Sequence, residues 1–106
     1  MSAQSGFAAI ASNTVRRYLA DLTAGNENAA YAELGKPPGD GSASLREEAF
    51  LDRSARIISV RTSATDATGA TVQAEVESSH GRYFATYHVT NGSGTPVIDY
   101  HDYIKE

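Results

Sequence analysis

The spacing of apolar residues changes once along this chain, near Asp52, and this change constrains the fold more than any other feature. Before it, apolar residues recur every three or four positions, as the buried side of a helix requires. The first such series consists of Ile10, Val15, Tyr18, Leu19 and Leu22. After it, apolar and polar residues alternate, which is typical of strands with one buried face. The sequence therefore predicts an α+β fold with the helices first and the sheet second.

A second, short helix should follow the first directly. Gly25 interrupts the first series and suits the end of a helix, and Asn26 is a good N-cap for the next one. The apolar side of this second helix consists of Ala29, Ala30, Tyr31 and Leu34. Two helices joined at Gly25 would form a bent or antiparallel helical layer.

Two features are expected between the second helix and the sheet. The segment 36–44 contains two prolines and two glycines, which favour turns, and we expect it to be a mobile loop. Ser44 and Glu47 match a capping box, which predicts a third, short helix that ends at Leu51.

Four strands are expected in the second half of the chain, over 56–62, 71–77, 82–90 and 97–104. Residues that favour turns separate them, for example at 66–69 and at 91–94. Because the connections are short, neighbouring strands should pair antiparallel, as a four-stranded meander on which the helices pack.

The length of 106 residues fits a single domain, 1–106. Hydrophobic residues make up 41% and charged residues 21%, so an ordinary globular core is expected. We interpret residues 1–6 as a flexible leader, either the native start or the junction left by a removed signal or anchor. The chain would be cytoplasmic, or extracytoplasmic if such a segment was removed upstream of Met1.

Charge and hydropathy exclude two classes of partner. The net charge is −4, spread evenly along the chain, and the pair Arg16-Arg17 is the only case of adjacent basic residues. Nucleic-acid binding needs clustered Lys and Arg, so no nucleic-acid partner is expected. No segment approaches the roughly 18 to 20 apolar residues of a membrane span, so we expect none in this chain.

The residue types also argue against metal and thiol chemistry. Cysteine is absent, which excludes disulfides, thiolate metal sites and a cysteine nucleophile. The three histidines, His80, His88 and His101, do not have the spacing of a metal site. We therefore expect no metal ion and no cofactor.

The order and spacing of these elements resemble a known family. The residues that carry the likeness are Val15, Tyr18, Leu19, Leu22, Gly25, Asn26, the segment 29–31, Leu34 and the terminal strand 97–104. In this respect the chain resembles small bacterial members of the nuclear transport factor 2-like group, which has the cystatin-like α+β cone. The resemblance implies a curved sheet and a pocket, where there is one, between the helices and the inner sheet face. It does not imply one chemistry, because the group includes isomerases, dehydratases, epoxide hydrolases and non-catalytic domains that dimerise.

A carboxylate and two histidines form the first candidate site. Asp99 and His101 are two positions apart on the last strand, and His88 lies on the preceding strand. A carboxylate that orients a histidine is suited to general acid–base catalysis. However, the apolar residues Ile98, Tyr100 and Ile104 should face the helices, which places Asp99 and His101 on the outside. A polar outer face explains all three residues without any reaction.

The second candidate is a tyrosine-lined pocket. Asp102 shares the expected inward face with Tyr100, and five tyrosines could line a cavity under the helices: Tyr18, Tyr31, Tyr83, Tyr87 and Tyr100. In an apolar cavity, Asp102 could act as a base next to tyrosine hydroxyls, as in an isomerase. The alternative is that Asp102 is solvated and the tyrosines belong to the core.

Two functional hypotheses follow. The first is a non-catalytic binding or assembly module, a homodimer or the partner of another protein, with an interface of Phe84, His88 and His101 on the outer face. The second is a small-ligand enzyme or carrier that binds a small apolar ligand in the tyrosine pocket. We favour the first, because no acid, base or nucleophile other than Asp102 is expected on the inner face.

Overall fold

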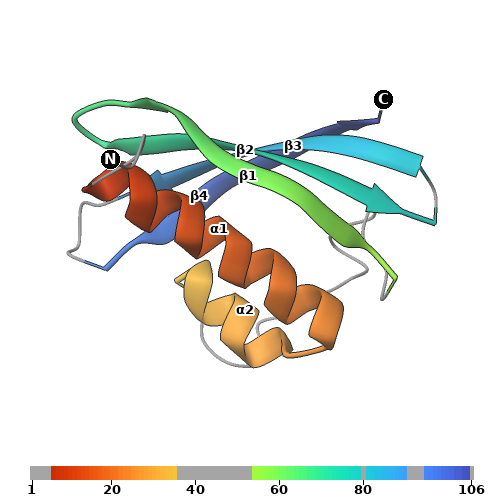
Figure 1. Ribbon diagram of the computed structural model, residues 1–106. Helices are drawn as coiled ribbons and strands as arrows, with labels where there is room; N and C mark the ends of the chain where they lie inside the picture. Colours follow the sequence, from red (N-terminus) through yellow and green to blue (C-terminus); the bar gives the residue numbers. More distant parts are fainter. Residues whose placement is uncertain (1–5, 36–53, 80, 91–94, 106) are drawn as a thin grey trace.

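The computed structural model describes residues 6–35, 54–79, 81–90 and 95–105. Two helices, α1 (Phe7–Ala24) and α2 (Glu27–Glu33), form one layer, and a sheet forms the other (Figure 1). Neither helix of this part of the chain is long and apolar enough to cross a membrane. Both helices begin and end close to where the apolar spacing predicts, and the α+β fold is confirmed.

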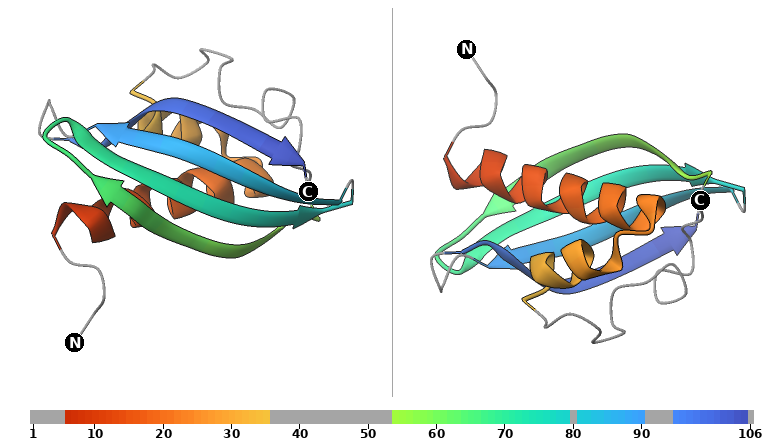
Figure 2. Two further views of the ribbon diagram at one scale, coloured as in Figure 1. Left: turned by 90° about the horizontal axis from the view of Figure 1, so that it is seen from above. Right: turned by 90° about the horizontal axis from the view of Figure 1, so that it is seen from below.

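The sheet is an antiparallel meander with the strand order β1-β2-β3-β4. Its strands are β1 (Arg56–Thr65), β2 (Gly69–Ser78), β3 (Gly81–Thr90) and β4 (Val97–Lys105). Figure 2 shows that both helices cover one face of this sheet, which we call the inner face, and leave the other, the outer face, uncovered by either helix. The four predicted strands are therefore confirmed, each one to three residues longer than expected.

The core lies between α1, α2 and the inner face. The helices contribute Ala11, Val15, Tyr18, Leu19, Leu22, Ala30, Tyr31 and Leu34. Ile10, which we expected in this series, is instead 46% exposed. The helical step of about 100° explains the difference, because Ala11 and not Ile10 lies in line with Val15 and Tyr18. Ala29 is also exposed rather than buried.

Hydrogen bonds made by polar side chains fix α1 against β1. The hydroxyl of Ser12 lies 2.8 Å from that of Thr62, which in turn donates to the carbonyl of Ala8 at 2.6 Å. Arg16 donates to the carbonyl of Val60 at 3.3 Å. Because Ser12 and Thr62 are at least partly buried, these bonds satisfy polar groups that would otherwise lose water without replacement.

The two turns that the structure describes agree with the sequence. Gly25 has a left-handed backbone (φ 84°), and its N–H bonds the carbonyl of Leu22 at 3.2 Å, as at many helix ends. Asn26 precedes α2 as expected, although its side chain makes no capping hydrogen bond. In the β1–β2 turn, the carboxylate of Asp66 accepts from the backbone N–H groups of Thr68 and Gly69, at 2.7 and 3.0 Å. A hydrogen bond from the Thr68 hydroxyl, followed by these two backbone bonds, lowers the pKa of Asp66 below its ordinary value.

A β-bulge in β4 reverses our expectation for that strand. Ile98 pairs with Val89 and Tyr100 with His88, so Asp99 is an extra residue between them. Beyond the bulge, His101 pairs with the inward-facing Tyr87. Each later residue of β4 therefore lies on the face opposite to the expected one, which changes the placement of Tyr100, His101, Asp102 and Ile104. The simple alternation that we assumed fails because one added residue shifts a period of two by one.

We expect deletion of Asp99 to be tolerated. It removes the bulge but preserves every later pair of β3 and β4, at the loss of one exposed hydrogen bond to His88. Deletion of His101 instead removes the ring that stacks on Tyr87, a contact worth about 0.5–1.5 kcal/mol. Urea unfolding should therefore show the smaller loss of stability for the Asp99 deletion. The opposite order would contradict the assigned register.

Four expectations fall wholly or mostly outside the described residues, namely the leader 1–6, of which residues 1–5 are outside, the loop 36–44, the capping-box helix 44–51 and the turn 91–94. His80 also lies outside them.

Candidate functional site

The outer sheet face carries its side chains in rows, because outward residues of neighbouring strands pair side by side. One of these rows, which we call the middle row, consists of Arg61, Gln73, Thr86 and Asp102. It lies between two further rows, which we name after Phe84 and Tyr100 and describe below. Each row contains one residue from each strand, so a row extends from the edge strand β1 to the edge strand β4.

The Phe84 row consists of Ser59, Glu75, Phe84 and Ile104. Phe84 is 45% exposed and Ile104 is 70% exposed, and the two are paired neighbours. A groove of about 290 Å³ lies between this row and the middle row, with Arg61 and Glu75 among its lining residues. An exposed apolar pair beside a groove is therefore the central feature of this face.

The Tyr100 row consists of Ala64, Thr71, His88 and Tyr100. Tyr100 is 54% exposed. Its place on the outer face is a consequence of the Asp99 bulge, and our expectation that it lines an inner pocket is wrong. The outer face therefore carries three large exposed apolar side chains, Phe84, Tyr100 and Ile104, on its β3 and β4 half.

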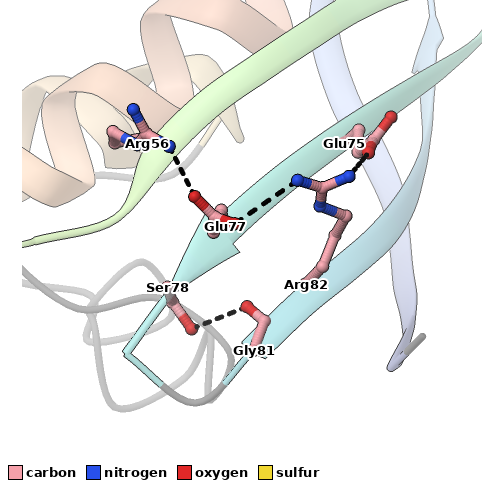
Figure 3. Close-up of polar contacts among 6 residues, drawn as sticks. All are labelled: Arg56, Glu75, Glu77, Ser78, Gly81 and Arg82. Carbon is pink, nitrogen blue, oxygen red and sulfur yellow. Dashed lines mark hydrogen bonds and ion pairs between the residues drawn. The ribbon is translucent and has the colours of Figure 1, made fainter.

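A network of ion pairs closes the end of the face beyond the Phe84 row (Figure 3). Glu77 accepts hydrogen bonds from Arg56 and from Arg82, the latter at 3.3 Å, and Arg82 also contacts Glu75 at 3.1 Å. The bond from Arg56, followed by that from Arg82, holds the pKa of Glu77 below its ordinary value. Exposed pairs of this kind contribute little stability, but they neutralise one another at the border of the face.

The middle row differs, because its charges lie far apart. Arg61 is on β1 and Asp102 is on β4, at opposite ends of the row. Asp102 accepts a hydrogen bond from the backbone N–H of Tyr103 at 2.8 Å. Within the described part of the chain, neither side chain takes part in an ion pair. The middle row thus presents a positive charge at one edge and a negative charge at the other.

In the histidine–carboxylate candidate, the structure pairs Asp99 with a different histidine from the one expected. Nδ1 of His88 lies 2.7 Å from the carboxylate of Asp99, and both side chains are partly exposed. His101 is on the inner face, where its ring stacks on Tyr87 with centroids 6.3 Å apart. The pair of Asp99 with His101, and the place of His101 in an outer interface, are therefore wrong. The pair His88–Asp99 is a surface pair outside the groove.

The inner tyrosines lie mainly in the core. Tyr18 and Tyr87 are fully buried and pack edge to face, with ring centroids 6.0 Å apart. Tyr31 and Tyr83 are 5% and 9% exposed. Asp102 pairs with Thr86 and so lies on the outer face, away from these rings. The structure thus brings together four of the five tyrosines but not their proposed base.

Sequence reasoning missed an aromatic cluster at the inner edge of β4. Tyr103 packs edge to face on Tyr83 with ring centroids 6.0 Å apart, and Nζ of Lys105 lies 6.0 Å from the centre of the Tyr83 ring. Within the described residues, no three possible metal ligands gather in one place.

Comparisons with models of known protein families, with curated proteins and with solved structures find no match to this chain.

Proposed function

We propose that this chain is a non-catalytic assembly module that self-associates through its outer sheet face. The observation that carries the proposal is the exposure of Phe84 and Ile104, side by side on the face opposite the helices. Scattered apolar residues are normal on a protein surface, but contiguous ones around a groove are typical of an interface. Phe84 was also the predicted anchor of this interface, and His88, which was predicted to belong to it, lies two rows away.

The distribution of polar residues supports the same function. Phe84 is on the inner strand β3, with Ile104 beside it on the edge strand β4, and the ion pairs of Arg56, Glu77 and Arg82 lie at the border beyond them. A polar rim of this kind is common in interfaces. Sheets also pack well on one another, at a separation of about 10 Å, because their side chains interdigitate.

The size of the face predicts the strength of the association. With strands about 4.8 Å apart and rows about 6.8 Å apart, two such faces bury roughly 800 Å². This is the size of a weak, transient interface. We therefore expect a dimer whose population depends on protein concentration in the micromolar range.

We further propose that the chain belongs to the nuclear transport factor 2-like group, as a small bacterial member. The helical layer on one face of an antiparallel meander supports this relationship. The alternative function, a small-ligand enzyme or carrier, draws less support. Its base Asp102 and its tyrosine Tyr100 both lie on the outer face, and Tyr18 and Tyr87 pack against each other in the core.

Replacing Phe84 with glutamate tests the proposed function. The substitution places a charge at the centre of the interface, and loss of a central aromatic anchor commonly weakens association by about thirtyfold or more. In sedimentation velocity over a range of concentrations, the wild type should show dimer and Phe84→Glu should show monomer, with unchanged circular dichroism.

Ile10→Glu is the matched control. Ile10 is exposed to the same extent as Phe84, 46% against 45%, but it lies on α1. This variant should associate as the wild type does. A wild type that is monomeric at every concentration, or a Phe84→Glu variant that remains dimeric, would refute the function.

A further inference from the structure

We propose that a second copy of this chain packs on the outer face about a two-fold axis parallel to the strands, so that Arg61 of each copy pairs with Asp102 of the other. This inference rests on the proposed self-association and specifies its geometry. It follows from the three rows of the outer face. When one row is turned end for end and placed over the same row of a second copy, the facing side chains complement each other in charge or in size.

The middle row supplies the charge complementarity. Arg61, Gln73, Thr86 and Asp102 lie side by side in register, so the two charges are about 14 Å apart at opposite edges of the sheet. This distance is too long for a direct pair within one chain. A second copy that presents the same row in reverse would bring each charge opposite its complement.

The symmetry of a two-fold interface limits how this can happen. An axis parallel to the strands, midway between β2 and β3, keeps each row in place but exchanges its ends, so β1 of one copy lies over β4 of the other. Arg61 of each copy then faces Asp102 of the other, so that the interface contains two such pairs. An axis across the strands at the same row would place Arg61 over Arg61 and Asp102 over Asp102, and like charges at close range are unfavourable.

Side-chain size gives a second, independent argument for the first axis. In the Phe84 row, the axis parallel to the strands places Ile104, 70% exposed, over the small side chain of Ser59. In the Tyr100 row it places Tyr100, 54% exposed, over Ala64. The outward residues on either side of Arg61 in β1 are thus small, and those on either side of Asp102 in β4 are large. With β1 over β1, small residues would leave voids, while the large residues of β4 would collide.

The central strands are compatible with the same arrangement. Phe84 of each copy lies near the axis, over Glu75 of the other. Glu75 is already paired with Arg82 of its own chain at 3.1 Å, so its charge is compensated next to the ring. The groove between the Phe84 row and the middle row provides space for the side chains that meet there.

Charge reversal at the two ends of the middle row tests the pairing. In Arg61→Asp, both cross-copy pairs become two facing carboxylates, and in Asp102→Arg both become two facing cations. Each variant should dissociate at least about tenfold more readily than the wild type. An equimolar mixture of the two should form a heterodimer of near wild-type affinity, because each copy then supplies the charge that the other needs. The double variant R61D/D102R should also recover self-association.

Sedimentation velocity measures the affinities, and native mass spectrometry identifies the heterodimer by mass. Arg17→Asp and Asp21→Arg are matched controls, because they make the same charge changes on α1 and should leave association unchanged. High salt should reduce the difference between the single variants and the wild type.

The outcomes separate this inference from the function on which it rests. If the wild type is monomeric at every concentration, both are refuted. If Phe84→Glu dissociates the dimer but the single charge reversals do not, or if the mixture of the two is no tighter than either alone, self-association stands and the Arg61–Asp102 pairing is overturned.

Discussion

Replacing Tyr87 with alanine is expected to lower the free energy of unfolding by about 3–5 kcal/mol, which is among the largest effects of any single truncation in this chain. Tyr87 is fully buried at the centre of β3, where its ring contacts Tyr18 on one side and stacks with His101 from β4. Its removal leaves a cavity between α1 and the sheet that the surrounding backbone cannot close. Because small domains are stable by only about 5–15 kcal/mol, much of the folded population could be lost.

Urea unfolding followed by far-ultraviolet circular dichroism measures this effect, with Tyr100→Ala as the control. Tyr100 has the same side chain but is 54% exposed, so its truncation should cost less than about 1 kcal/mol at concentrations where the protein is monomeric. The comparison also tests the bulge, because an inward Tyr100 would be as costly to remove as Tyr87. Equal losses in the two variants would contradict the assignment of faces.

The sequence predicted the fold because the two halves of the chain have unambiguous periods. The series Val15, Leu19 and Leu22 has helical spacing, and Val72, Ala74 and Val76 alternate without exception; all six are buried. A buried face repeats over many residues, so one misplaced residue such as Ile10 does not change the prediction. The Gly25 end of α1 was predictable for a local reason, since a left-handed position favours glycine.

The last strand was predicted less well, although its sequence contains a signal that we did not use. Val97-Ile98 and Tyr103-Ile104 are adjacent apolar pairs, and strict alternation cannot place both members of a pair on the same face. Asp99 lies between the two pairs, and Asp is disfavoured in regular strands. The bulge at Asp99 exchanges the faces of the second pair, so that Tyr103 rather than Ile104 lies on the inner face. Where two adjacent apolar residues lie near a polar residue in a strand, alternation alone does not say which of the two is buried, and both assignments have to be considered.

The candidate interface could be predicted only in part. The exposure of Phe84 follows from alternation within β3, which has no bulge. The alignment of Arg61 with Asp102 in one row does not follow from alternation, because it depends on the register of three strand pairs. β1 has two irregularities, at Ile57/Ser59 and at Thr62/Ala64, and β4 has its own. No spacing between two residues 41 positions apart indicates that they lie in one row.

Replacing Gly69 with alanine is expected to destabilise the protein by about 3 kcal/mol, contrary to the usual preference for alanine over glycine in a strand. Gly69 is the first residue of β2, and a Cβ atom there would clash with the carbonyl oxygen of Val89 and lie 2.9 Å from its carbonyl carbon. Both are backbone atoms of the paired strand β3, which cannot move aside as a flexible side chain would. The gain of roughly 0.5–1 kcal/mol from a stiffer unfolded chain is therefore outweighed by the displacement of β2 from β3.

Such a displacement also disturbs the β1–β2 turn, in which the carbonyl of Gly69 accepts from the backbone N–H of Asp66 and the N–H of Gly69 donates to the Asp66 carboxylate. Thr68→Ala separates the two effects, since it removes the 2.6 Å bond from the Thr68 hydroxyl to Asp66 but introduces no clash. Urea unfolding should show a loss of less than about 1 kcal/mol for Thr68→Ala and a several-fold larger loss for Gly69→Ala. If Gly69→Ala were as stable as the wild type, the close approach of β2 to Val89 would be refuted, and with it the register that places Gly69 opposite Thr90.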